Sequence, residues 1–263
     1  MHIVSLLHRL RLVRPAHFVY STYCDVRANC QYYLAAHCGY HPRSLGYESQ
    51  DRVVIEELFK RKRGGFFVDA GAADGFSGSN TWVLENHYGW RGICIEPNER
   101  AFQRLQKTRA CCCVNACLNT LAGEVEFVDD GEHSGIVADD TDNNPHLRTW
   151  LAGASSERKA ARPAETLEDV LARCEAPAVI DYLSLDVEGA ELRVLGSFPF
   201  DRYTFLAMTV ERVSEALHGV LTQNDYVFVR NLLTDSLYLH RRLASALPGL
   251  RFQEYAPLPP KNF

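Results

Sequence analysis

The sequence predicts an α/β protein whose mainly parallel sheet is covered by helices on both faces. Three observations carry this prediction: short apolar runs alternate with helical segments, acids or glycines follow the apolar runs, and 263 residues are enough to bury one large core. Apolar residues form 46% of the chain and charged residues 23%, which is the balance of an ordinary folded protein rather than a disordered one.

The regular pattern begins with a helix over residues 49–63. Ser49 is placed to cap this helix, Val54 and Leu58 share one face, and Gly64 follows its basic end. Strands and helices then alternate, as they do in a parallel sheet. In order, we expect a strand at 66–70, a helix at 80–89, a strand at 92–97, a helix at 98–109 and a strand at 111–116.

The second half of the chain continues this pattern after an interruption. Residues 123–128 alternate as an antiparallel strand does, whereas residues 129–163 are polar and rich in turn formers, so we expect a long functional loop there. Thr166 and Asp169 form a capping pair for the next helix. The remaining expected elements are a helix at 165–174, a strand at 179–189, a helix at 190–198, a strand at 203–212 and a hairpin of 226–230 with 236–240.

These patterns divide the chain into three parts: an N-terminal appendage at 1–46, a main domain at 47–245 and a C-terminal tail at 246–263. Arginines at positions 9, 11 and 14 interrupt the apolar residues of the appendage, so no membrane span forms there. Four apolar residues of this appendage, Ile3, Leu6, Leu7 and Leu10, share one helical face. We expect this segment to pack on the body of the protein, with a surface-seeking or targeting helix as the alternative.

Charge and cysteine content narrow the function classes. The net charge is −5, from 28 basic and 33 acidic residues, which disfavours a protein that binds the backbone of DNA or RNA. Nine cysteines occur without any Cys-x-x-Cys pair, and the consecutive Cys111–Cys113 suit neither a disulfide framework nor a tetrahedral metal site. We therefore expect reduced thiols that act as small core residues in a cytoplasmic protein, and a zinc site lacks supporting spacing.

The stretch FFVDAGAADGFSGSN has the form of a cofactor-binding turn between a strand and a helix. A dinucleotide fingerprint needs a second glycine where this chain has Ala73, between Gly71 and Gly75. Asp69 and Asp74 flank the turn and would repel a phosphate, whereas they would attract a ligand that carries an ammonium and a sulfonium. The pattern favours S-adenosylmethionine over NAD.

The second predicted strand ends at Glu96, and this position supports the same cofactor. A carboxylate there offers two acceptors whose separation matches the two hydroxyls of a ribose. The alternative is a solvated acid before a turn. Together, the glycine turn and the acid at the end of the strand predict a nucleoside site above the first two strands.

Six separated blocks of the sequence resemble the FkbM-type S-adenosylmethionine-dependent methyltransferase family. They are SQDR, GGFFVDAGAADGFSGSNTWVLE, GWRGICIEPN, VNACL, HSGI and VIDYLSLDVEGAELRVL, and in the order of the family they cover about residues 47 to 240. The resemblance implies a Rossmann-like class I methyltransferase fold with a mainly parallel seven-stranded sheet and a C-terminal antiparallel hairpin. It also implies O-methylation of a hydroxyl on a small molecule or glycan.

The resemblance also assigns roles to individual residues. It implies that Asp69, Gly71 and Gly75 line the methionine part of the cofactor, that Glu96 binds the ribose and that Asn115 lies near the adenine. The full set of expected cofactor-binding residues is Asp69, Gly71, Ala72, Gly75, Glu96, Asn115 and Asp186.

Acids at two later strand ends are the candidates for catalysis. Asp186 is the expected base or acceptor-positioning group, and Glu188 would project to the same face of an extended segment. His133, in the polar loop, could share the proton abstraction or be a loop histidine in water. Asp186 with Glu211 could alternatively hold a divalent metal, although we do not expect a required metal.

The favoured prediction is therefore a cytoplasmic S-adenosylmethionine-dependent O-methyltransferase that acts on a small-molecule or glycan acceptor. We expect it to bind no nucleic acid and to have no firm membrane association. One alternative is a binding or trafficking module that keeps the fold without turnover. A further, less favoured alternative is an NAD-dependent oxidoreductase or epimerase of the same general architecture.

Overall fold

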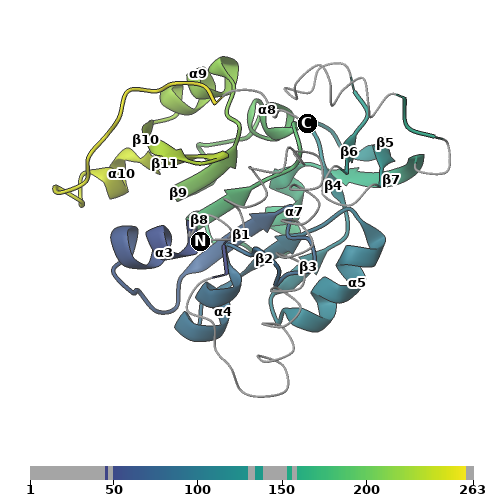
Figure 1. Ribbon diagram of the computed structural model, residues 1–263, viewed down its shortest axis with the longest axis horizontal. Helices are drawn as coiled ribbons and strands as arrows, with labels where there is room; N and C mark the ends of the chain where they lie inside the picture. Colours follow the sequence, from purple (N-terminus) through teal and green to yellow (C-terminus); the bar gives the residue numbers. More distant parts are fainter. Residues whose placement is uncertain (1–44, 47–49, 130–133, 139–152, 156–158, 259–263) are drawn as a thin grey trace, which may run out of the picture.

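The computed structural model describes residues 45–46, 50–129, 134–138, 153–155 and 159–258. A seven-stranded sheet forms its centre (Figure 1), with the strand order β10-β11-β9-β8-β1-β2-β3. The strands are β1 (Phe66–Ala70), β2 (Arg91–Ile95), β3 (Cys112–Val114), β8 (Val179–Leu185), β9 (Thr204–Glu211), β10 (Tyr226–Leu232) and β11 (Asp235–His240).

The sheet is parallel except at one strand. β1 pairs in parallel with β2 on one side and β8 on the other, whereas β11 runs antiparallel to both β9 and β10. The chain order reverses between β1 and β8, and ligands of open α/β sheets bind beyond the carboxyl ends of the strands at such a point. The predicted fold class, including the C-terminal antiparallel hairpin, is confirmed.

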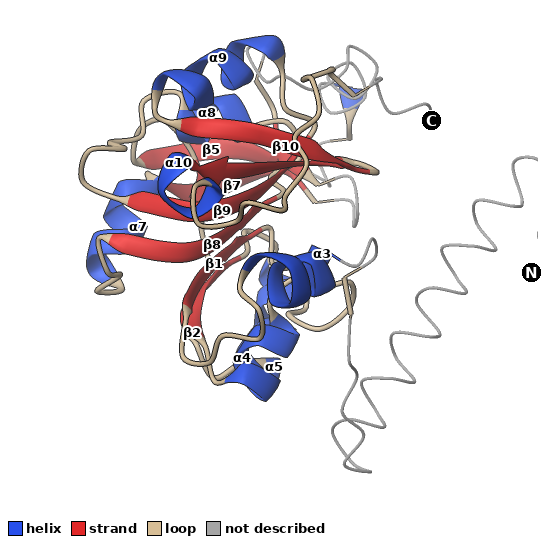
Figure 2. Ribbon diagram, turned by 90° about the vertical axis from the view of Figure 1, so that its left-hand side faces the viewer, coloured by secondary structure: helices blue, strands red, loops and turns tan. Residues whose placement is uncertain are grey.

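Helices cover both faces, as Figure 2 shows, because successive side chains of each buried strand point to opposite sides. Phe67 of β1 belongs to the core under one set of helices, and Val68 belongs to the core under the other. The first set is α3 (Gln50–Arg52) with its continuation η1 (Val53–Leu58), α4 (Trp82–Tyr88), α5 (Glu99–Thr108) and α10 (Arg241–Ala244). The second set is α7 (Leu167–Arg173), α8 (Glu191–Leu195) and α9 (Glu215–Gln223).

A second, four-stranded sheet was not predicted. Its order is β4-β7-β5-β6, and its strands are β4 (Cys117–Leu118), β5 (Gly123–Val128), β6 (Gly135–Ile136) and β7 (Lys159–Glu165). The predicted loop at 129–163 is thus wrong at residues 135–136, which form β6, and at residues 159–163, which belong to β7. Arg162 and Pro163 interrupt any apolar pattern in this strand. Antiparallel pairing of residues 159–164 with β5 holds it in place.

Two further differences concern helices. The first helix ends at Leu58 rather than near 63, since Lys60 and Arg61 adopt positive φ angles of 48° and 62°. Helix α9 was not predicted, although Ser214 caps it by accepting a hydrogen bond from the Leu217 amide. The predicted appendage lies outside the described residues except for 45–46.

The described part of the C-terminal segment packs against the main domain. The Tyr255 hydroxyl donates to the Val213 carbonyl at 2.8 Å, and its ring stacks on His218 with 3.8 Å between ring centroids. The Gln253 amide donates to the Val229 carbonyl of the edge strand β10.

Across the described residues we find no helix with the length and apolar character needed to cross a bilayer. The predicted domain boundaries stay a prediction.

Candidate active site

The turn after β1 is pressed against the turn after β8. Gly71 adopts a φ of +85°, and a Cβ atom added to it would lie 1.8 Å from the Asp186 carbonyl oxygen. The Asp186 amide donates to the Ala70 carbonyl, and the Gly71 and Ala72 amides both donate to the Ile95 carbonyl. Only glycine fits this position, because both the backbone conformation and the close approach exclude a side chain.

Glu96 follows β2 and closes the other side of this turn. Its Oε2 accepts a hydrogen bond from the Ala73 amide at 2.8 Å, and its Oε1 accepts one from the Asn98 amide at 2.7 Å. Burial raises the pKa of Glu96 to about 7, although these two hydrogen bonds oppose the shift. Asn115 is close by, since its Nδ2 donates to the Glu96 carbonyl at 2.8 Å.

Asp69 and Asp74, the two acids that flank the turn, differ in how their charge is balanced. Asp69 is buried, accepts a hydrogen bond from the Thr81 hydroxyl at 2.5 Å and lies 3.9 Å from Arg109. Asp74 accepts hydrogen bonds from the amides of residues 76 and 77 and from the Ser77 hydroxyl. Both carboxylates are therefore occupied by internal partners. The role of Asp69 beside the methionine stays a prediction.

Three carboxylates do gather at the ends of β8 and β9. Ligand atoms of Asp186, Glu188 and Glu211 all lie within 4.8 Å of one another. Their convergence was predicted, but the reason given for Glu188 was wrong. The strand ends at Leu185, and Glu188 has a φ of +53°, so a left-handed turn completed by Gly189 brings its side chain to the cluster.

In this carboxylate cluster (Asp186, Glu188 and Glu211), the environment raises the affinity of Asp186 for a proton. Desolvation by the surrounding protein and the like charges of Glu211 and Glu188 raise its pKa well above the ordinary value. Because the Asp186 side chain is still exposed to solvent whereas Glu211 is buried, we ascribe this shift chiefly to the two neighbouring charges. Arg212 lies 3.3 Å from Glu211 and offsets part of this negative charge.

The family model described as "Methyltransferase FkbM domain" matches residues 69–239, more than half of the chain. The chain belongs to the FkbM methyltransferase family. A search of curated proteins with this sequence found no match.

Solved structures with a similar fold are distant in sequence. A methyltransferase FkbM from Methylobacillus flagellatus KT shares 13% identity and covers 67% of this chain with a TM-score of 0.36; the aligned region is 43% of that protein, so this chain spans less than half of its length. A precorrin-6y C5,15-methyltransferase from Geobacter metallireducens GS-15 shares 12% identity (TM-score 0.39, 76% of this chain and 90% of that one). A methyltransferase from Pyrococcus furiosus shares 11% (TM-score 0.39, 84% and 96%).

The site of this FkbM-family protein includes polar residues that sequence reasoning missed. The Gln50 side chain donates to Asp235 at 3.1 Å, and Asp235 pairs in register with Glu211. The Asn80 side chain donates to the Ser184 hydroxyl at 3.0 Å. Asn80 and Gln50 lie in two of the blocks that resemble the family, at the starts of predicted helices. A position in a predicted helix does not show that a side chain approaches the strand ends.

Two other residues complete the description. Glu191 anchors the start of α8, because its Oε1 accepts a hydrogen bond from the Val187 amide at 3.0 Å. His133 lies outside the described residues, and its catalytic role stays a prediction.

The residues above β1 and β2 have the chemistry to hold an S-adenosyl nucleoside. The buried carboxylate of Glu96 offers acceptors to ribose hydroxyls, and the close contact at Gly71 keeps the backbone of the turn free of side-chain bulk. The carboxylate cluster beyond the turn supplies negative charge near a cationic group. We find these features compatible with the cofactor that the family implies.

Proposed function

We propose that this protein transfers the methyl group of S-adenosylmethionine to a hydroxyl of a small molecule or glycan. The observation that carries the proposal is the contact between Gly71 and the Asp186 carbonyl, which places the carboxylate cluster directly beside the cofactor turn. A base that receives an acceptor proton must lie within reach of the methyl donor, and this contact supports such an arrangement.

When bound, the cofactor would supply a methyl group activated by its sulfonium. In our proposal Glu96 accepts hydrogen bonds from the ribose, and the Asn115 side chain, fixed by its bond to the Glu96 carbonyl, borders the adenine. The negative carboxylate cluster favours the cationic part of the cofactor. These groups bind and orient the donor.

Asp186 acts on the acceptor in this proposal. In its ionised form, its carboxylate takes the proton of the acceptor hydroxyl as the oxygen attacks the methyl carbon, and its raised pKa makes it a stronger base than an ordinary aspartate. Glu188 and Glu211 keep that pKa high and help to orient the acceptor.

A divalent cation in the carboxylate cluster is a second candidate, favoured by the mutual approach of its three oxygen-bearing groups. In that case Asp186, Glu188 and Glu211 would hold the cation, which would lower the pKa of an acceptor hydroxyl. Activity before and after chelation, with Mg²⁺ or Mn²⁺ added back, separates the two versions.

The proposal is tested by binding first and turnover second. Calorimetry with S-adenosylhomocysteine should show binding, whereas NADH should not bind; the reverse result would overturn the cofactor assignment. Incubation with S-adenosylmethionine and a panel of glycans and small hydroxyl compounds should then give a product heavier by one CH₂ unit. Cofactor binding without turnover on any acceptor would favour the binding-module alternative.

A further inference from the structure

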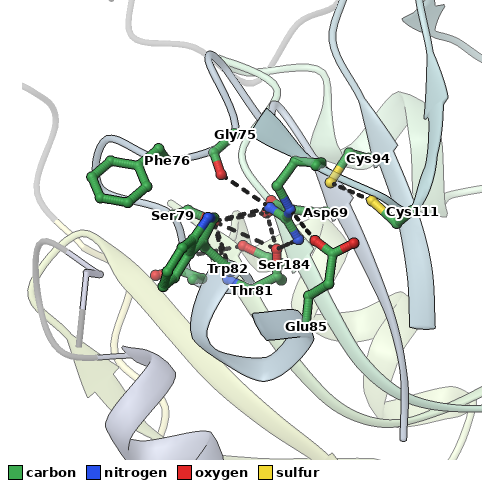
Figure 3. Close-up of polar contacts among 12 residues, drawn as sticks. Asp69, Gly75, Phe76, Ser79, Thr81, Trp82, Glu85, Cys94, Cys111 and Ser184 are labelled. Carbon is green, nitrogen blue, oxygen red and sulfur yellow. Dashed lines mark hydrogen bonds and ion pairs between the residues drawn. The ribbon is translucent and has the colours of Figure 1, made fainter. Parts of the chain in front are cut away.

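Arg109 follows α5, far along the chain from the cofactor turn, yet its contacts lie beneath that turn. Its side chain has no solvent exposure. Figure 3 shows several of its partners, among them Asp69, Gly75, Thr81 and Glu85, converging on one buried point. A fully buried guanidinium with partners on β1, on the segment after it and on α4 requires an explanation beyond solubility or surface charge.

Arg109 contacts both ends of the segment that joins the cofactor turn to α4. Its Nη1 donates to the Gly75 carbonyl at 3.2 Å and to the Ser79 hydroxyl at 3.3 Å, and its Nη2 donates to the Thr81 hydroxyl at 3.0 Å. Ser79 in turn accepts hydrogen bonds from the amides of Thr81 and Trp82 at the start of α4. The guanidinium thereby links the turn to the first residues of the helix.

Charge balance also depends on Arg109. Its Nε forms an ion pair with Glu85, and its Nη1 lies 3.9 Å from Asp69, so one cation serves two largely buried acids. Its guanidinium carbon lies 5.2 Å from the centroid of the Phe67 ring. Removal of the cation would leave two carboxylates with little access to water.

Gly75 and Arg109 fit each other sterically. Gly75 has a φ of +78°, and a Cβ atom added to it would lie 2.8 Å from Cγ of Arg109 and 2.5 Å from Cδ1 of Leu105. The turn therefore rests directly on the Arg109 side chain. On its opposite side, the turn is held by the hydrogen bond from Ala73 to Glu96.

We propose that Arg109 is a positioning residue that holds the 71–81 segment in the conformation that binds the cofactor. This inference rests on the proposed function. Arg109 acts on the cofactor through Gly75 and through the Ala73–Glu96 hydrogen bond, and it has no part in proton transfer. Loss of its guanidinium N–H donors therefore weakens cofactor binding. The turnover rate at saturating cofactor stays close to that of the unaltered protein.

Arg109→Lys is the main test variant, because it keeps the buried positive charge but cannot reach Gly75, Thr81 and Glu85 at once. Arg104→Lys is the matched control, since Arg104 is exposed on α5, the helix that Arg109 follows. Unaltered protein must first bind S-adenosylhomocysteine; absence of binding there would count against the proposed function rather than against the role of Arg109.

We expect Arg109→Lys to raise the Kd for S-adenosylhomocysteine about tenfold to a hundredfold, as the loss of charge-assisted hydrogen bonds does. Arg104→Lys should bind as the unaltered protein does. With both variants shown by circular dichroism to be folded at the assay temperature, an affinity of Arg109→Lys within twofold of the control would overturn the proposal.

Chemical rescue separates positioning from a general loss of stability. In Arg109→Ala, guanidinium ion at millimolar concentration should restore part of the cofactor affinity, while urea, a neutral molecule of the same shape, should not. Equal effects of the two additives would contradict the positioning role. Should Arg109→Ala not fold, Ser79→Ala removes one acceptor of Arg109 and keeps the charges: it should weaken binding several-fold, and unchanged affinity would also count against the proposal.

Discussion

Glu96 provides a direct test of the cofactor assignment, because its ionisation falls within an accessible pH range. Burial raises its pKa from 4.5 to about 7, and the charges of Asp69 and Asp129 act in the same direction. The amides of Asn98 and Ala73 oppose the shift. A ribose that donates both hydroxyls needs the carboxylate form, since a protonated carboxyl has lost one acceptor. Lowering the pH should therefore weaken cofactor binding.

The size of the effect follows from this pKa. If the ionised form alone binds, the apparent Kd equals the intrinsic Kd multiplied by one plus the ratio of protonated to ionised Glu96. That factor is about 1.1 at pH 8, about 2 at pH 7 and about 11 at pH 6. We expect S-adenosylhomocysteine to bind roughly tenfold more weakly at pH 6 than at pH 8.

Calorimetry across this range in buffers of differing ionisation enthalpy measures both the Kd and the protons released on binding. Near pH 7, binding should release about half a proton. The matched variant is Glu96→Gln, which should bind weakly at every pH and lose the dependence. A Kd constant within twofold from pH 8 to pH 6 would refute the reasoning. An unchanged pH dependence of the Kd in Glu96→Gln would also refute it and would point to Asp69 or Asp186, whose pKa values are also raised.

The remaining predictions concern the turn and the carboxylate cluster. Asp186→Asn should keep its affinity for S-adenosylhomocysteine and lose about a hundredfold to ten-thousandfold in turnover, and full activity would remove Asp186 from the mechanism. Gly71→Ala should abolish cofactor binding and lower the Tm, since its Cβ would meet a carbonyl oxygen at 1.8 Å; unchanged binding and melting would contradict the assigned contact. If a cation is required, Glu211→Gln should weaken the Mg²⁺ dependence of turnover, whereas activity that survives chelation would exclude that version.

The central strands could be predicted from the sequence because their physical signal is local. β1 and β8 are buried on both faces, so each is a short, nearly continuous apolar run. β7 carries no such signal. Its residues include Arg162 and Pro163, and its extended form depends on pairing with β5, which pattern reading of a single segment does not reveal.

The sequence predicts those site residues that directly follow parallel strands, because the ends of such strands lie at one edge of the sheet. Gly71, Glu96 and Asp186 follow three adjacent parallel strands, so their proximity follows from the topology. Arg109 was not predictable in this way. It stands at the basic end of a helix, where a solvated residue is the usual expectation, and its burial arises from the packing of α5 against the cofactor turn.

Hydrogen bonds within the turn give a further reason to disfavour a dinucleotide. A pyrophosphate at such a turn needs free backbone amides. Here the amides of residues 71 and 72 donate to Ile95, that of residue 73 donates to Glu96, and those of residues 76 and 77 donate to Asp74. The amides of residues 81 and 82, at the start of α4, donate to Ser79. A diphosphate would have to break several of these bonds, whereas a nucleoside held through its ribose hydroxyls and its cationic group leaves them intact.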